Sequence, residues 1–427
     1  MQVIVHPPKR EWDRLLERPA MDSSSLEATV SNILKEVKTG GDEALIRFSL
    51  IFDKIILKNL LASPEELQEA EHLLDVPLKQ AILTAKKNIE LFHSRQLIQE
   101  AVVETMPGIR CWRKSVPVER VGLYIPGGTA PLFSTLLMLG IPATIAGCKQ
   151  IVLCTPPGKN GKIHPAILYT AHLLGIQTIV KSGGAQAIAA MAYGTRSVPK
   201  VYKIFGPGNQ FVTCAKQLIQ KDGIAIDMPA GPSEVCILAD ETANPSFIAA
   251  DLLSQAEHGA DSQAVLITTS KRIAEETVQC VQDQLQELPR KTLAEKALTH
   301  SKAIIAKSME DALELVNEYA AEHLIIAMDQ AESISEKIHQ AGSVFIGHFS
   351  PESAGDYASG TNHTLPTNGF AKAYSGVSVD SFVKKISFQQ LTPQGLANVA
   401  EAVEIMAEAE GLTAHARAVR IRSTSKQ

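Results

Sequence analysis

Length, composition and charge exclude several classes of protein for this chain of 427 residues. The length exceeds what one ordinary hydrophobic core supports, so we expect two or more domains. A hydrophobic content of 45% with 20% charged residues is typical of a globular chain, and the net charge of −5 without a Lys/Arg-rich run argues against a nucleic-acid partner.

The amino-terminal sequence MQVIVHPPKREWDRLL lacks the charged-then-apolar pattern of a secretory signal, so we do not expect secretion. The six cysteines form no CxxC pair and no metal-finger spacing. Without an export signal they are expected to be reduced thiols, and the expected compartment is the cytoplasm.

The first hundred residues favour helices, because 24–53 carries apolar residues at helical spacing with glycines at a break. After Arg120 short apolar β-type runs alternate with helical stretches. The alternation crosses the segment IDMPAGPSEVCILAD and continues to GSVFIG, at 342–347. This pattern predicts an α/β fold with two parallel sheets of the doubly wound kind.

The uncharged stretch 121–148 is long enough to span a bilayer. Pro126, Pro131 and Pro142, together with several glycines, would break a spanning helix. A buried strand–loop–helix unit is the better interpretation, and we expect no membrane partner.

From Ser387 onward the sequence favours helices again. Glu410 ends one helix at Gly411, and Thr413 can cap the next helix, which leaves His415 in its first turn.

Gln255 and His258 raise the possibility of a metal site. Asn244 and Pro245 predict the start of their helix and Gly259 its end, so both side chains should share a face of the last turn. A capping or surface role is the alternative for such a pair.

A long loop at 350–369 carries Asp356 and His363, and loops of this length are often functional, although a solvated connector would look similar. A glutamine, an aspartate and two histidines together would supply two oxygens and two imidazoles. Such a set, without a thiolate, suits a Zn²⁺ that leaves room for a substrate, or Mn²⁺ or Co²⁺ in its place.

Glu322 and His323 lie where a predicted helix runs into an apolar strand. Adjacent Glu and His offer two proton carriers with different reference pKa values. An ion pair at a helix end is the alternative.

Three glycine-bearing turns follow predicted strands, in YIPGGTAP, SGGAQAI and FGPGNQF, and their backbone amides could bind phosphate. None is a GxGxxG fingerprint. Cys111 has three basic neighbours that would favour a thiolate, but no base is linked to it, so we do not expect Cys111 or Cys148 to be catalytic.

Eight motifs occur together in one order over nearly the whole chain: LYIPGG, GGAQAIAA, IFGPGN, DMPAGPSEV, LLSQAEHG, EHLII, SPESAGDYASGTNH and LTAH. With them the sequence resembles the histidinol dehydrogenase family. Ala321, where the family pattern has proline, is a minor departure.

The resemblance implies oxidation of L-histidinol through L-histidinaldehyde to L-histidine with two NAD⁺, the last steps of histidine biosynthesis. Glu322 and His323 would be the catalytic pair. The implied metal ligands, normally for zinc, are Gln255, His258, Asp356 and His415. The implied substrate contacts are Ser233, Gln255, His258, His323, Asp356, His363, Glu410 and His415. The implied NAD contacts are Tyr124, Gln186 and Asn209.

The implied architecture is a homodimer of two incomplete Rossmann-like domains with exchanged terminal segments and shared active sites. Residues 1–21 would form an arm, and 22–129 with 231–377 the larger domain, which holds the metal and catalytic residues. Residues 130–230 would form the smaller, NAD-contacting domain, and 378–427 a helical segment that completes the partner's site.

Two other functions remain open from the residues. A zinc hydrolase of a small amine substrate would use Glu322 to activate water without a redox step. A metal-dependent binding protein would hold such a ligand and release it unchanged.

Overall fold

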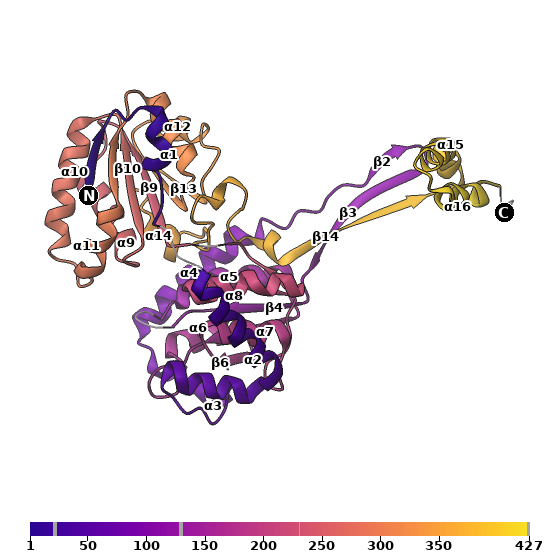
Figure 1. Ribbon diagram of the computed structural model, residues 1–427, viewed down its shortest axis with the longest axis horizontal. Helices are drawn as coiled ribbons and strands as arrows, with labels where there is room; N and C mark the ends of the chain where they lie inside the picture. The colour runs from indigo at the N-terminus through magenta and orange to yellow at the C-terminus, as the bar shows by residue number, and fades with distance from the viewer. Residues whose placement is uncertain (20–23, 128–130, 230, 425–427) are drawn as a thin grey trace.

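The computed structural model describes residues 1–19, 24–127, 131–229 and 231–424. The chain forms two lobes, each built on a parallel sheet, and a long arm that leads away from them (Figure 1). The predicted α/β fold with two parallel sheets is therefore confirmed. The predicted domain boundaries near residues 21, 129 and 230, and Gly128 and Thr129 of the first glycine turn, lie outside the described residues.

The first lobe contains a five-stranded parallel sheet in the order β6-β5-β4-β7-β8. This is the 3-2-1-4-5 order of a doubly wound nucleotide-binding sheet without a sixth strand. Its strands are β4 (Arg120–Tyr124), β5 (Gln150–Thr155), β6 (Thr178–Lys181), β7 (Lys203–Phe205) and β8 (Ala225–Ile226). One face is covered by α2 (Ser24–Phe48), α7 (Gly184–Tyr193) and α8 (Gln210–Ile219). On the other face lie α3 (Pro64–Leu73), α4 (Val76–Ser94), α5 (Phe133–Ala146) and α6 (Pro165–Leu173).

The second lobe contains a six-stranded parallel sheet in the order β1-β11-β10-β9-β12-β13. Apart from β1 at its edge, it repeats the 3-2-1-4-5 order. Its strands are β1 (Gln2–Val5), β9 (Glu234–Ala239), β10 (Gln263–Thr268), β11 (Lys302–Ile305), β12 (His323–Ala327) and β13 (Ser343–Ile346). One face packs against α9 (Pro245–Ala256), α10 (Lys271–Leu285) and α11 (Lys291–His300). The opposite face packs against α1 (Trp12–Leu15), α12 (Met309–Tyr319) and α13 (Ala331–Ser335).

The predicted grouping of 22–129 with 231–377 is wrong. Val30, Leu45 and Leu60 share a core with Tyr124 and Val152, and β4 pairs with β5 and β7 of the five-stranded sheet. The periodic apolar residues of these helices specify a buried face, but they do not specify which sheet covers it. The first strand likewise joins the six-stranded sheet rather than a free arm, because β1 pairs with β11.

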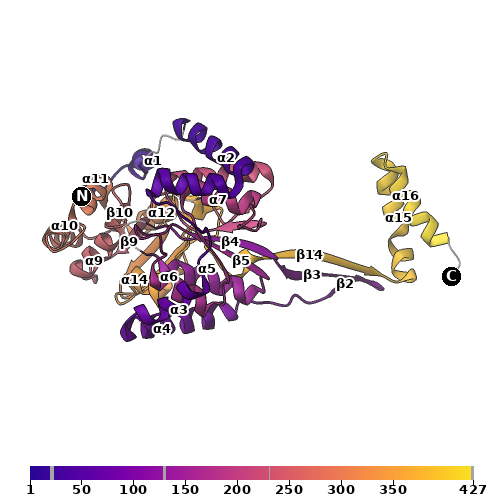
Figure 2. The same ribbon diagram turned by 90° about the horizontal axis from the view of Figure 1, so that it is seen from below.

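The arm is a three-stranded antiparallel sheet that ends in a helical hairpin. β2 (Val103–Met106), β3 (Ile109–Pro117) and β14 (Val383–Leu391) form the sheet, and β14 pairs with all nine residues of β3. At its far end lie α15 (Pro393–Ala409) and α16 (Thr413–Thr424), away from both lobes in each view (Figures 1 and 2).

Three further expectations need correction. Ser387–Leu391 is strand rather than helix, because it pairs with Ile109–Arg113. Residues 379–382, assigned to the terminal segment, pack in the core of the five-stranded lobe, where the Phe382 ring stacks on Phe205 at 4.0 Å. The loop 350–369 contains the short helix α14 (Glu352–Tyr357). In the described part of the chain, no helix combines the length and apolar character needed to cross a membrane.

Candidate active site

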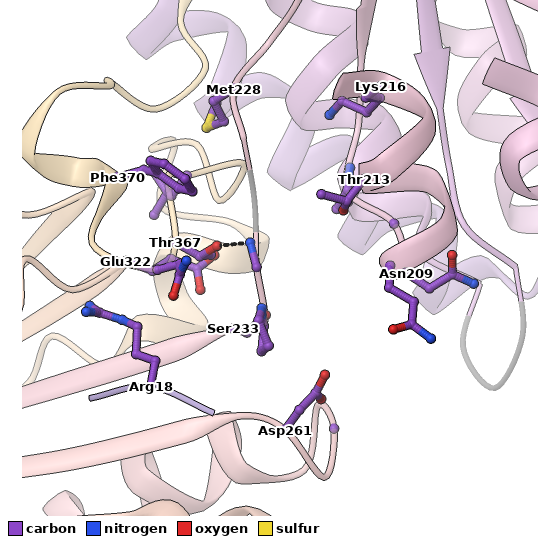
Figure 3. A pocket seen from close by; sticks show the side chains of 18 of the residues that line it. Arg18, Asn209, Thr213, Lys216, Met228, Ser233, Asp261, Glu322, Thr367 and Phe370 are labelled. Atoms are coloured by element: carbon purple, nitrogen blue, oxygen red, sulfur yellow. Dashed lines mark hydrogen bonds between the residues drawn. The ribbon is translucent and has the colours of Figure 1, made fainter. Parts of the chain in front are cut away.

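A cleft of about 1230 Å³ separates the two lobes, and each lobe meets it with a different end of its sheet. Ser233, Asp261 and Glu322 precede β9, β10 and β12, so the six-stranded sheet presents the amino ends of its strands. Gly206 and Asp227 follow β7 and β8, so the five-stranded sheet presents carboxyl ends. Figure 3 shows Ser233, Asp261 and Glu322 on one side, and Asn209, Thr213 and Lys216 of the α8 region on the other.

Gln255 and His258 lie at the end of α9, close to where the sequence places them. Asn244 caps the helix by accepting from the Ser246 amide, and Pro245 occupies its first turn, as predicted. The helix ends at Ala256, so His258 lies just beyond it in a turn, where its amide still donates to the Gln255 carbonyl at 3.3 Å. Gln255 is 1% exposed, whereas His258 is exposed and lines the cleft.

Glu322, His323 and Asp356 form the charged centre of the site. Nδ1 of His323 lies 3.7 Å from the Glu322 carboxylate, and Nε2 lies 3.3 Å from Oδ1 of Asp356. Glu322 also accepts from the backbone amide of Glu234 at 3.0 Å. Within the described residues, neither ring nitrogen of His323 nor Oδ1 of Asp356 has a partner of hydrogen-bond geometry. These buried atoms are therefore available to a ligand.

The charges at this centre shift the ionisation of every member. Burial lowers the pKa of His323, but the charges of Glu322, Asp356 and Glu352 outweigh burial and raise it to about 10. Burial raises the pKa of Glu322 to about 8, although His323 opposes the shift. Burial also raises the pKa of Asp356, yet His323, His363 and His258 together lower it below its usual value. A proton thus resides on His323, between carboxylates.

His363 has both ring nitrogens engaged by protein atoms. Nδ1 donates to the Asp356 carbonyl oxygen at 2.8 Å, because a carbonyl can only accept. Nε2 lies 3.0 Å from the Thr135 hydroxyl on α5 of the other lobe. Burial lowers the pKa of His363, so the ring is neutral and Nε2 accepts the Thr135 hydrogen. Thr135 is thus a contact across the lobes that the sequence did not reveal.

A second cavity of about 720 Å³ lies at the carboxyl ends of β4, β5 and β6. Tyr124, Gln186 and Asn209, the residues expected to contact NAD, all line it. Asn209 also lines the cleft, so the two spaces adjoin at this residue. The hydroxyl of Tyr124 accepts from the Gly184 amide at 3.0 Å, and Asn209 caps α8.

The turn that carries Asn209 is held rigidly. Gly206 has a φ of +126°, and a Cβ there would lie 2.0 Å from the Tyr124 carbonyl oxygen, so only glycine fits. Its amide donates to Asp227 at 2.8 Å and its carbonyl accepts from Lys216 at 2.9 Å, while Lys216 and Asp227 form a buried ion pair. The predicted phosphate-type turn is therefore a fixed wall between the two spaces.

Two of the predicted site residues are not brought to the cleft by this chain. Glu410 follows α15 and His415 lies in α16, and both are exposed on the arm hairpin. Cys111 and Cys148, the two cysteines considered as nucleophiles, are also apart from the cleft. Cys111 lies in β3 of the arm, and burial raises the pKa of Cys148 to about 12, which disfavours a thiolate.

Gln255, His258 and Asp356 carry ligand groups of the types that bind a zinc ion. They supply an amide oxygen, an imidazole and a carboxylate, and Oδ1 of Asp356 is buried without a hydrogen bond among the described residues. In the same ranges no group of three or more His, Cys, Asp or Glu is placed to hold a metal. His415, the remaining ligand expected from the sequence, lies on the arm.

The fold and site together define an α/β oxidoreductase: a nucleotide-type sheet with an adjoining cavity faces a lobe that bears an acid–base pair. The family model for histidinol dehydrogenase matches residues 16–423. A histidinol dehydrogenase of Bacteroides fragilis is 59% identical over 99% of both chains, and that of Escherichia coli K12 is 52% identical over 96% of this chain and 94% of its own. The crystal structure of histidinol dehydrogenase from Elizabethkingia anophelis is 54% identical, with a TM-score of 0.97 over 99% of this chain and 98% of the other.

The chain belongs to the histidinol dehydrogenase family. The predicted family is confirmed, and so is the oxidoreductase class. The zinc hydrolase that the sequence left open finds no support in these relatives.

Proposed function

We propose that this enzyme of histidine biosynthesis oxidises L-histidinol to L-histidinaldehyde and then to L-histidine, and reduces two NAD⁺ in the process. The observation that carries the proposal is the placement of Glu322 on the wall of a cleft that adjoins a nucleotide-sized cavity at Asn209, with His323 buried beside Glu322. An alcohol at this position would have a proton acceptor on one side once His323 has lost its proton, and the bound cofactor as hydride acceptor on the other.

Substrate binding would use polar groups that face the cleft from the six-stranded lobe. Ser233, His258 and His363 line the cleft, and Asp356 lies behind them against His323. The lone pair on Nε2 of His363, shared with Thr135 in the free enzyme, can accept a hydrogen from the substrate.

Gln255, His258 and Asp356 would hold the zinc ion, with His415 from a second copy as the fourth ligand. When bound, zinc supplies a positive charge and coordination that fixes the nitrogens of the substrate. The charge of Asp356 is one cause of the raised pKa of His323, so neutralising it moves that pKa back toward its usual value.

His323 and Glu322 would divide the proton transfers. His323, once deprotonated, takes the hydroxyl proton of the alcohol in the first oxidation. The aldehyde must add water before a second hydride can leave, and Glu322, whose pKa is about 8, is the adjacent base for that water. Its hydrogen bond from the Glu234 amide holds one carboxylate oxygen, and the residue lines the cleft.

Tyr124, Gln186 and Asn209 would contact NAD in the second cavity, and the cofactor supplies the hydride acceptor. The helices α7 and α8 begin at this cavity, so the positive ends of their dipoles would favour the negatively charged diphosphate.

The enzyme would act as a homodimer in which α15 and α16 of one copy reach the cleft of the other. The support is that Glu410 and His415 are exposed at the end of an arm that leaves its own lobes, while the described residues contain no cluster of three or more His, Cys, Asp or Glu that could hold a metal (Figures 1 and 2).

The test is an assay with histidinol and NAD⁺ before and after chelation. We expect two NADH per histidinol, loss of activity when the metal is removed, and recovery with Zn²⁺, Mn²⁺ or Co²⁺. Full activity in protein shown by elemental analysis to be free of metal would overturn the metal site, and one NADH per histidinol would overturn the double oxidation.

A further inference from the structure

Glu352 is a buried carboxylate that the roles proposed above do not use. It begins α14 and is 1% exposed. In the described part of the chain, no Lys or Arg lies within ion-pair distance of it, and its only such neighbour is His323, whose Nδ1 is 4.0 Å from Oε2. A buried carboxylate without a cation destabilises a fold relative to an apolar side chain. A role in the site, rather than in folding, accounts for its presence.

The contacts of Glu352 lead to Gln255. The hydroxyl of Ser254 donates to Oε1 of Glu352 at 2.8 Å. The amide end of Gln255 that faces Glu352 lies 3.3 Å from both carboxylate oxygens, and the hydrogen-bonding pattern assigns the NH₂ group to that end. Glu352 therefore holds two consecutive residues of the last turn of α9.

This contact removes an ambiguity in the amide. The oxygen and NH₂ ends of a glutamine have nearly the same shape, and only the oxygen can coordinate a metal ion. A carboxylate accepts hydrogen bonds and cannot donate them, so it favours the orientation with NH₂ toward itself. The carbonyl oxygen of Gln255 then points away from Glu352.

We infer that Glu352 is a positioning residue that orients the Gln255 amide so that its oxygen, and not its nitrogen, is offered to the metal ion. The inference rests on the proposed assignment of Gln255 as a ligand. Glu352 touches neither substrate nor cofactor in this scheme, and its effect on the metal ion is exerted through Gln255.

The test measures the Zn²⁺ affinity of purified full-length protein by competition with a chelator of known affinity. Glu352→Gln keeps the shape but can donate from its own NH₂, so both orientations of Gln255 become possible. We expect Zn²⁺ to bind about 10- to 100-fold more weakly. Asp251→Asn is the control. It removes the charge of a different carboxyl group, on α9, which is one cause of the raised pKa of Glu352. Its affinity should stay within about threefold of the parent enzyme.

A double-mutant cycle separates orientation from loss of charge. In a Gln255→Ala background, Glu352→Gln should weaken Zn²⁺ binding by less than about twofold, because no amide remains to be oriented. An equal loss in both backgrounds would show that Glu352 acts through its charge, and it would overturn the inference while leaving Gln255 a ligand. If Gln255→Ala binds Zn²⁺ like the parent enzyme, the ligand assignment fails and the inference fails with it.

Ser254→Ala gives a second reading if Glu352→Gln folds poorly. It frees one oxygen of Glu352 without touching the amide, so we expect a loss of about threefold in affinity that disappears in the Gln255→Ala background. A loss that persists there would contradict the inference.

Discussion

The two lobes share the strand order 3-2-1-4-5 but face the same cleft with opposite ends of their sheets. The five-stranded lobe offers carboxyl ends, where the helices α7 and α8 begin. The six-stranded lobe offers amino ends, where Ser233 and Glu322 lie just before β9 and β12. In doubly wound sheets ligands bind beyond the carboxyl ends of the strands, and only the first lobe follows this rule.

The comparison teaches that strand order alone does not determine which end of a sheet carries chemistry. Carboxyl ends followed by helix amino termini favour an anionic cofactor. The amino ends of the six-stranded sheet instead bring buried side chains together, and there Glu322, His323 and Asp356 reach unusual pKa values. We therefore expect substitutions in one lobe to change cofactor binding and substitutions in the other to change the reaction.

The largest effect is expected for the metal site of the six-stranded lobe, and it tests whether a second copy of the chain completes that site. His258→Ala and His415→Ala should each lower activity by roughly 100-fold or more, because each removes a proposed metal ligand. Chains of both kinds are unfolded and refolded together. Sharing between copies puts both defects in one site of a mixed dimer and leaves the other site intact, so about a quarter of the parent activity should return. An inactive mixture, with mixed dimers confirmed by mass, rules out the exchanged arm.

A smaller effect is expected for Glu322→Gln, which should slow the second oxidation by about 10²- to 10⁴-fold and the first much less. In single turnover, the NADH yield should fall from two equivalents toward one. In the parent enzyme the second oxidation should rise with pH through about 8, because Glu322 is protonated below its raised pKa and acts as a base only above it. That rise should be absent in the variant. Equal slowing of both oxidations would instead assign Glu322 to orienting His323.

Substitution in the five-stranded lobe should act on the cofactor alone. Gln186→Met keeps the volume of a buried side chain that lines the second cavity but removes the amide group that could hydrogen-bond to the cofactor. We expect the KM for NAD⁺ to rise about tenfold while kcat stays within about twofold. A fall in kcat with an unchanged KM would place the hydride chemistry, and not only cofactor binding, in this lobe.

The smallest effect concerns the hydrogen bond that joins the lobes. Thr135→Val removes the hydroxyl that holds His363 but keeps the side-chain shape, and should raise the KM for histidinol about fivefold, with kcat little changed. Thr135→Ser should restore the parent value. The control is Thr170→Val, since the Thr170 hydroxyl is buried in α6 and has no partner in the described part of the chain. If both valine variants behave alike, Thr135 serves packing rather than orientation.

The sequence predicted the individual helices and strands better than the sheets against which they pack. The alternation of strands and helices after Arg120 and the capped start of α9 are both present. Residues 24–94 were grouped with the wrong sheet, because an amphipathic helix carries no information about which surface buries it. Ser387–Leu391 was taken for helix, because β14 is exposed along most of its length and carries no regular alternation of buried and exposed residues.

The site was predicted unevenly for a similar reason. Residues inside recognisable motifs, such as Glu322 and His323, were identified. Glu352 and Thr135 gave no signal, because a carboxylate or hydroxyl becomes significant only when tertiary packing buries it beside a functional group. That Glu410 and His415 leave their own lobes was expected only from the family resemblance, since spacing along the chain does not report direction in space.

The pairing of β3 with β14 also determines how late in translation the arm can form. Ser115 and Lys385 lie opposite each other in the arm, yet 270 residues separate them along the chain. At about 5 to 20 residues per second, a ribosome needs roughly 15 to 50 s to travel from one strand to the other. Throughout that interval β3 has one edge without its final partner, and an unpaired edge invites pairing with other chains. Both lobes can be largely complete by then, so it is the release of the finished chain that decides when an arm first exists.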